Sequence, residues 1–526
     1  MDRRIERDLL ALRDAEWGAG RRLSDAPLRM TLLYPSPYHI AMSSLGYLQI
    51  YRQANERQGT RCERAMVPEP HVLRRHRENR CPLLTVETQT PAADVHLIGV
   101  SHAYELELVG IAEALRMGGL EPLAKDRSAQ DPLIILGGPI TNSNPMPSSV
   151  FADMVLLGEA EGLLAELLDR LESEPDAARG DPQKRTRLLE DFARRPGFFI
   201  PSLHGDRLPP IARADDTALP AYASLQTLNT ELSGMWLVEP ERGCHRGCTF
   251  CVMRRTTNGG MRTVPVQRLV DLIPADATKV GLVGAAVSDH PQIKDLLTEI
   301  VDQRGLGIGI SSLRADRLDD TFIAMLARGG YRSLTVALDA PSERLRWSIE
   351  KNIKEHHVLA AAELARKHGM RHLKLYVVVG LPGETDEDRN ELVSFCSKLR
   401  RILPVVLGVS PFVPKFHTPL ADADFVGEAE ADRILKNLKR SLSGTVKVRG
   451  PGAREAFVEA RLSQGGFEHG RAAVSVLEAG GKLSHWKRVL RDLPGHGRPR
   501  NFDQLVVPPT RRHPRRPSGP VEAVVP

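Results

Sequence analysis

The stretch from Glu241 to Cys251 reads Glu-Arg-Gly-Cys-His-Arg-Gly-Cys-Thr-Phe-Cys, and it decides most of what this sequence indicates. Its cysteines, Cys244, Cys248 and Cys251, follow the spacing C-x3-C-x2-C. Three clustered thiolates can hold three irons of a four-iron cluster, and the fourth iron then has no protein ligand from this loop. Because an open iron is a place for a substrate or cofactor to bind, the loop predicts a catalytic centre.

Zinc and a disulfide are the simpler interpretations of these cysteines. A structural zinc usually takes four ligands from paired Cys or His motifs, and His245 is too close to Cys244 to be the fourth. A disulfide would leave an odd thiol in the loop, and the other cysteines, Cys62, Cys81 and Cys396, are scattered singly. Both interpretations are disfavoured against an iron–sulfur cluster.

The composition is that of an ordinary globular protein. The chain has 526 residues, and this length predicts two or three domains. Of its residues 41% are hydrophobic, and its net charge is +6. No apolar run has the length of a membrane span, and the charged N-terminus lacks the apolar region of a secretory signal. Six cysteines do not make a disulfide framework, so we expect a cytoplasmic protein with no membrane partner.

The cysteine loop resembles the signature of the radical SAM superfamily, in which an aromatic residue, here Phe250, precedes the third cysteine. A strand-like run at 235–239 precedes the loop, as the first barrel strand of that family does. The resemblance implies a [4Fe-4S] cluster whose open iron binds S-adenosylmethionine. An electron from a donor such as flavodoxin or ferredoxin then cleaves the cofactor to methionine and a 5′-deoxyadenosyl radical.

The first half of the chain predicts a doubly wound parallel sheet. Short apolar runs at 30–34, 94–101, 133–139 and 154–161 alternate with helical patterns, which is typical of parallel α/β folds. We assign 1–27 to an N-terminal arm, 28–175 to this α/β domain and 176–232 to a linker with a small wrapping element.

The second half predicts a partial barrel. Strand candidates lie at 235–239, 279–284, 307–313, 333–338, 374–380 and 405–410. They fit the (β/α)6 barrel that the resemblance implies, over 233–425. In a C-terminal extension, 426–494, the segments 427–442 and 453–490 look helical, and we expect both to pack against the barrel. The Pro- and Arg-rich tail, 495–526, is predicted to be disordered, and its arginines are a weak indication of RNA binding.

The resemblance also implies which residues hold S-adenosylmethionine at the barrel's strand ends. A Gly-rich segment with Gly284 and Ser288 would hold the amino end of the methionine. Ser312 and Arg314 follow the third strand, where Arg314 would pair the carboxylate. Asp339 would contact the ribose or the amine. Val378 and Gly380 would flank the adenine, near Phe250.

The first domain resembles the cobalamin-binding domains that precede many radical SAM barrels. The segments 34–46 and 158–161 carry this resemblance with Gly137 and Gly138, which would let the backbone approach the corrin. His39, on the loop after the first strand, is the candidate lower ligand of cobalt. His96 fits the motif D-x-H-x-x-G but lies inside an apolar strand, so we set it aside.

Cobalamin-dependent methyl transfer to an unactivated centre is the function that this combination favours. Methylthiotransferases of the superfamily carry a second cluster on three N-terminal cysteines, and here that region has only Cys62 and Cys81. The alternatives are a corrinoid-independent radical rearrangement or cyclisation, or an RNA modification, with a vestigial first domain. Outside the residues expected to bind the cofactors, no residue indicates what the substrate is.

Overall fold

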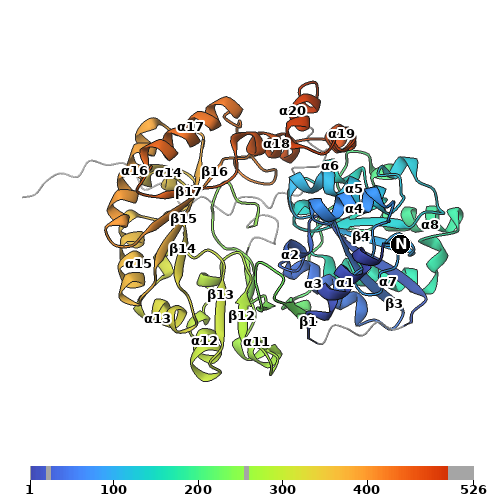
Figure 1. Cartoon of the computed structure of the whole chain (residues 1–526), viewed down its shortest axis with the longest axis horizontal. Helices are drawn as coiled ribbons and strands as arrows, with labels where there is room; N and C mark the ends of the chain where they lie inside the picture. The colour runs from blue at the N-terminus through green and yellow to red at the C-terminus, as the bar shows by residue number, and fades with distance from the viewer. Residues whose placement is uncertain (1, 19–24, 254–259, 496–526) are drawn as a thin grey trace, which may run out of the picture.

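The computed structural model describes residues 2–18, 25–253 and 260–495. Two α/β halves lie side by side, and the C-terminal helices run along the top of both (Figure 1). The predicted tail falls almost entirely outside the described residues. No helix in the described part of the chain has both the length and the apolarity to cross a membrane.

The first half is built on a six-stranded sheet with the order β3-β2-β4-β5-β6-β7. Its strands are β2 (Leu28–Tyr34), β3 (Thr60–Met66), β4 (Leu97–Ser101), β5 (Leu133–Gly137), β6 (Met154–Leu156) and β7 (Phe198–Phe199). All neighbours pair parallel except β6 and β7. The apolar runs expected from the sequence form β2, β4, β5 and β6, whereas β3 and β7 were not predicted.

Helices cover both faces of this sheet. On one face, α3 (Leu45–Asn55), α7 (Ala160–Ser173) and α8 (Pro182–Phe192) share a core with the strands. On the other face, α5 (Leu108–Met117) is joined by α18 (Ala453–Ser463), α19 (Phe467–Glu478) and α20 (Leu483–Leu490). The expectation that 453–490 packs against the barrel is wrong for α19 and α20, whose apolar residues complete the core of the first half, whereas Ala453 at the start of α18 belongs to the barrel core. As expected, α17 (Glu428–Ser441) packs on the barrel.

The second half is a partial barrel of two parallel sheets. One has the order β13-β12-β9 and the other β14-β15-β16-β17, and a single bridge between Leu313 and Val336 joins them. The strands are β9 (Trp236–Val238), β12 (Lys279–Leu282), β13 (Gly307–Ile310), β14 (Ser333–Ala337), β15 (His372–Val379), β16 (Val405–Pro411) and β17 (Lys447–Arg449). The six predicted strands are confirmed, and β17 extends the sheet beyond them.

The outside of the barrel is covered by α11 (Val266–Leu272), α12 (Ile293–Leu297), α13 (Asp320–Arg328), α15 (Glu355–Lys367) and α16 (Asp386–Arg400). The other α-helices and strands of the described residues are α1 (Arg3–Asp14), β1 (Glu16–Trp17), α2 (Tyr38–Ala41), α4 (Pro70–Glu78), α6 (Met146–Ser149), α9 (Pro201–His204), β8 (Gln226–Thr227), β10 (Glu241–Gly243), β11 (Met261–Thr263) and α14 (Glu343–Ser348).

A buried ion-pair network ties the N-terminal segment to the first sheet. Arg64 on β3 is 1% exposed, and its guanidinium lies 2.7 Å from Glu16 and 2.6 Å from Glu87. Its backbone N–H also donates to Glu87 at 2.6 Å. Since both carboxylates are buried, each charge is stabilised only by its partners.

Replacing Arg64 with Met is expected to lower the free energy of unfolding by about 3–5 kcal/mol, because two buried carboxylates lose their partner. The midpoint of urea unfolding measures the loss. The control is Arg29→Met on β2, whose side chain is 47% exposed and 3.6 Å from Asp94, and which should cost about 1 kcal/mol or less. Equal losses in the two variants would contradict the role of the network.

Candidate active site

The cysteine loop leaves β10, which pairs antiparallel with β11. Two backbone hydrogen bonds fix its middle. The Thr249 N–H donates to the Ile349 carbonyl at 3.0 Å, and the Leu420 N–H donates to the Thr249 carbonyl at 3.3 Å. The loop is thereby held between the end of α14 and the segment after β16, and its three cysteines are partly exposed and free of disulfides.

The chemistry of the loop fits an iron–sulfur cluster. Within the described residues, no three His, Cys, Asp or Glu side chains lie close enough to share one metal ion. The three free cysteines fit a cluster, in which each cysteine holds a different iron. Burial raises the pKa of the Cys251 thiol to about 11, so a bound cation is needed to keep its thiolate at neutral pH.

Asp289 anchors the first part of the loop. Its side chain is fully buried, and Arg246 of the loop reaches it with two hydrogen bonds of 2.7 and 2.6 Å. Arg317 adds a third, at 2.9 Å. Burial opposes ionisation, but the guanidiniums around Asp289 keep its pKa below the ordinary value. Asp289 therefore positions the loop.

An ion pair lies beside Cys248. Asp339, at the end of β14, is 2.5 Å from the ammonium of Lys351, which is 7% exposed. Arg314 donates to the Lys351 carbonyl at 3.0 Å and pairs with Asp316. Burial raises the pKa of Cys248, and the charge of Lys351 opposes the rise. The predicted residues Arg314 and Asp339 are thus brought together near the cysteine loop. Lys351 belongs to the same group of charged residues, although the sequence gave no indication of it.

Glu241 is another residue that the sequence reasoning missed. It is fully buried, and its Oε1 accepts the Ala286 N–H at 2.7 Å. A Cβ on Gly284 would clash with that oxygen, so Gly284 makes room for the carboxylate. Burial raises the pKa of Glu241 to about 7. Ser288 is buried nearby, while Ser312 is exposed on the loop after β13.

The predicted adenine-flanking residues do share one place. Phe250 and Val378 pack together against an apolar cluster that includes Phe412. Gly380 has a left-handed backbone with φ of 77°, and its N–H donates to Glu384 at 2.7 Å.

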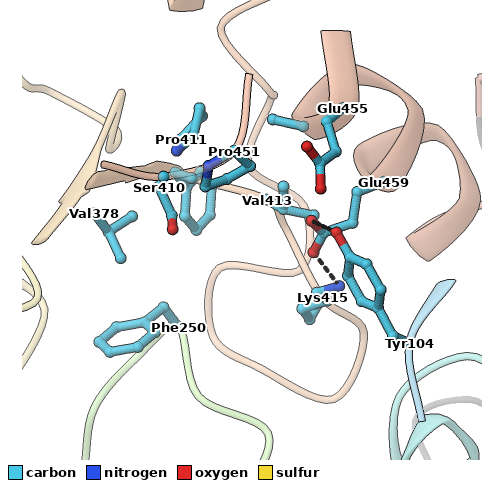
Figure 2. A pocket seen from close by; sticks show the side chains of 13 residues that line it. Tyr104, Phe250, Val378, Ser410, Pro411, Val413, Lys415, Pro451, Glu455 and Glu459 are labelled. Atoms are coloured by element: carbon cyan, nitrogen blue, oxygen red, sulfur yellow. Dashed lines mark hydrogen bonds and ion pairs between the residues drawn. The ribbon is translucent and has the colours of Figure 1, made fainter. Parts of the chain in front are cut away.

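A cavity of about 630 Å³ lies where the two halves meet (Figure 2). Phe250, Val378 and Ser410 line its barrel side, and Tyr104, which follows β4, lines the side of the first half. Glu455 and Glu459 of α18 form part of its wall.

A polar network holds the Tyr104 side of the cavity in place. The Tyr104 hydroxyl donates to Glu459 at 2.9 Å, and the Lys415 ammonium contacts Glu459 at 2.9 Å and also pairs with Glu105. Burial opposes the charge of Lys415, but these carboxylates raise its pKa. Since Lys415 follows β16 and Glu105 follows β4, the network links the strand ends of the two halves.

The cobalt-ligand candidates lie elsewhere. The His39 imidazole is 3.1 Å from Glu69, and both line a separate apolar cavity of about 390 Å³ beside α1. Gly138, with φ of 113°, packs so closely that a Cβ would lie 2.5 Å from the His102 carbonyl. A Cβ on Gly137 would lie 3.9 Å from Leu156, which is an ordinary contact distance. His96 accepts the Arg29 N–H at 3.0 Å at the start of β4, far from the carboxyl ends of the strands.

Comparisons with known proteins agree with this architecture. The family model for radical SAM proteins, N-terminal, matches residues 46–201, and that for the radical SAM superfamily matches residues 238–396. The uncharacterized protein MJ0966 of Methanocaldococcus jannaschii is 30% identical over 335 residues, which are 61% of this chain and 68% of that protein. The chain belongs to the radical SAM superfamily.

Two further proteins resemble this radical SAM enzyme. The uncharacterized methyltransferase PH0819 of Pyrococcus horikoshii is 23% identical over 279 residues, 51% of this chain and 58% of that protein. The solved structure of the radical S-adenosylmethionine methyltransferase TsrM from Kitasatospora setae, with tryptophan and a cofactor analogue bound, covers 75% of each chain. Its TM-score is 0.53 and its sequence identity is 17%, so it confirms the fold.

Family membership determines two cofactors. A radical SAM enzyme uses a [4Fe-4S] cluster and S-adenosylmethionine, and it needs a reductant. Cys244, Cys248 and Cys251 are the cysteines with the required spacing.

Proposed function

We propose that this radical SAM enzyme methylates an unactivated centre, with cobalamin as the methyl carrier. The observation that carries the proposal is the cavity of about 630 Å³, which is lined by Tyr104 of the first half on one side and by Phe250 and Val378 of the barrel on the other (Figure 2). A substrate there lies within reach of both halves. The names of two relatives support methyl transfer, since PH0819 is called a methyltransferase and TsrM is one.

In this proposal the corrin binds to the first half, at the carboxyl ends of its strands. A doubly wound sheet offers its ligand crevice beyond the carboxyl ends of its strands, and β5 ends on that edge at Gly137. TsrM has also been solved with cobalamin and a [4Fe-4S] cluster bound. In this proposal 28–175 is the cobalamin-binding domain and 233–425 the radical SAM barrel. Since His39 pairs with Glu69, we propose that cobalt takes no imidazole from it.

Side chains of this chain would bind and orient the reactants. When bound, the cluster and S-adenosylmethionine supply the 5′-deoxyadenosyl radical, and cobalamin supplies the methyl group. Phe250 and Val378 offer apolar surface to the adenine, and Arg314, Asp339 and Lys351 offer charges to the methionine and ribose end. The network of Lys415, Glu459 and Tyr104 keeps the cavity wall rigid.

A corrinoid-free radical reaction is the second candidate, and one observation favours it. The segment after β16 already contacts the carboxyl edge of the first sheet. Lys415 pairs with Glu105, and His417 contacts the Asn142 carbonyl at 2.9 Å. These contacts take up part of the edge that a corrin would face.

Titration with hydroxocobalamin separates the two candidates. We expect the anaerobically reconstituted enzyme to bind the corrinoid and to form 5′-deoxyadenosine when a reductant is added. The visible spectrum of bound cobalt should be the same in His39→Ala as in the wild type. A spectrum that changes in this variant would restore His39 as a ligand. No binding, with or without S-adenosylmethionine, would favour the corrinoid-free reaction.

A further inference from the structure

The four-stranded sheet β14-β15-β16-β17 has one face on the core and one face toward the barrel interior. Along β15, Leu373, Leu375 and Val377 are buried under the outer helices, while the residues between them are exposed or half-exposed. Tyr376 on the interior face is 49% exposed. It is one of five large hydrophobic side chains that are exposed among the described residues.

The pairing register gathers cations on this interior face. Lys374 pairs with Val406, which pairs with Lys447. In the next row toward the strand ends, Tyr376 pairs with Gly408, which pairs with Arg449. Because paired residues point to the same face of a sheet, Lys374, Lys447 and Arg449 lie on the same face as Tyr376, in its row or the row before it. All three cations are exposed.

No carboxylate balances these charges within the face. The interior positions of the four strands are Ser333, Thr335, Ala337, His372, Lys374, Tyr376, Val378, Val406, Gly408, Ser410, Lys447 and Arg449. None of them is acidic, and among the described residues neither lysine nor Arg449 forms an ion pair. Lys279 and Arg332 line a further cavity, of about 450 Å³, between β12, β13 and the start of β14. At the strand ends, Asp339 follows β14 and is paired with Lys351, and Glu455 and Glu459 lie beyond them on α18.

Gly408 holds the Tyr376 ring in position. A Cβ on Gly408 would lie 2.6 and 2.7 Å from two ring carbons, so the ring rests against β16 where no side chain intervenes. The ring is thus supported by the sheet and open toward the interior. A supported aromatic ring on a sheet face, flanked by cations, is how several folds stack the bases of single strands.

We propose that this interior face binds single-stranded RNA, with phosphates on Lys374, Lys447 and Arg449 and a base stacked on Tyr376. Thr335 and Ser410 on the same face offer hydroxyls to the ribose 2′-hydroxyl, which favours RNA over DNA. Val378 and Ser410 are two residues further along their strands, about 7 Å from the Tyr376 row, and they line the cavity of the proposed active site. The inference rests on the proposed function in that the RNA would be the methyl acceptor.

The test is binding of a fluorescein-labelled single-stranded oligoribonucleotide of mixed sequence to the reconstituted full-length enzyme, followed by anisotropy over a range of salt. Changing Lys374, Lys447 and Arg449 together to Gln should lower the slope of log affinity against log salt by about 2, since each phosphate contact contributes about 0.7. Tyr376→Ala should weaken binding about tenfold, and Tyr376→Phe should not, because the ring is what stacks.

Matched controls locate the binding. Changing Lys436, Lys439 and Arg440 on the exposed side of α17 to Gln removes the same charge and should leave the slope unchanged. If the face variants bind RNA as the wild type does, or if only changing Arg511, Arg512, Arg515 and Arg516 of the tail to Gln abolishes binding, the inference is overturned. Equal competition by the DNA strand, the RNA duplex or an acidic peptide also overturns it. Since binding needs no turnover, failure of the cobalamin titration leaves it standing.

Discussion

Replacing any one of Cys244, Cys248 and Cys251 with Ala is expected to abolish the iron–sulfur cluster. Each thiolate holds a different iron, so the loss of one leaves an iron with no protein ligand. After anaerobic reconstitution, the variants should lack the brown absorbance and most of the bound iron and acid-labile sulfide. Formation of 5′-deoxyadenosine from S-adenosylmethionine should fall to background, because the electron that cleaves the sulfonium comes from the cluster.

Cys396→Ala provides the control. Cys396 lies on α16 in the barrel core, fully buried, and takes no part in the loop, so that variant should keep its iron. Folding of the loop variants should also persist, because Arg246 and Thr249 anchor the loop through Asp289 and the Ile349 carbonyl. A triple cysteine variant that retains full iron would refute the assignment.

The apolar strands could be predicted because a strand that is buried on both faces has a run of consecutive apolar residues. β4 and β5 are short runs of Leu, Ile and Val that end in Gly or Ser, which is the pattern of strands covered on both faces. β3 could not be predicted in this way, since its sequence is Thr-Arg-Cys-Glu-Arg-Ala-Met. Arg64 is buried there only because Glu16 and Glu87, distant in the sequence, neutralise it.

The position of α19 and α20 illustrates a second limit. Their amphipathic patterns correctly predicted helices, but an apolar stripe on a helix does not indicate which core the helix packs against. The barrel was the nearest core along the chain, whereas Val476, Trp486 and Leu490 pack into the first half.

The candidate site was predicted where a local motif carries it and missed where it depends on the fold. Cysteine spacing marks the loop without further information. Glu241 and Lys351 carry no motif, since their roles arise from contacts with Gly284 and Asp339. One signal was available for Glu241. It lies three residues before Cys244, so the sequence itself places an acid beside the predicted centre.

Asp339 is expected to be the charged residue on which S-adenosylmethionine binding depends most. Its carboxylate holds the Lys351 ammonium at 2.5 Å beside Cys248. Removing its charge leaves Lys351, 7% exposed, without its partner, and breaking a buried pair costs about 3–5 kcal/mol. Hydrogen bonds to charged groups contribute about 1.5–3 kcal/mol, so a lost cofactor contact corresponds to about 10–150-fold weaker binding.

Asp339→Asn is the variant that isolates this charge. Asp339 has a left-handed backbone with φ of 64°, a conformation that Asn tolerates and Ala does not, so Asn removes the charge without straining the chain. We expect full iron content, but weak S-adenosylmethionine binding in equilibrium dialysis. Asp320→Asn, an exposed carboxylate paired with Lys367 on the outer helices, should bind as the wild type. Normal cofactor binding by Asp339→Asn would remove Asp339 from the cofactor site. A loss of iron together with cofactor would show instead that the Asp339–Lys351 pair supports the cluster loop itself.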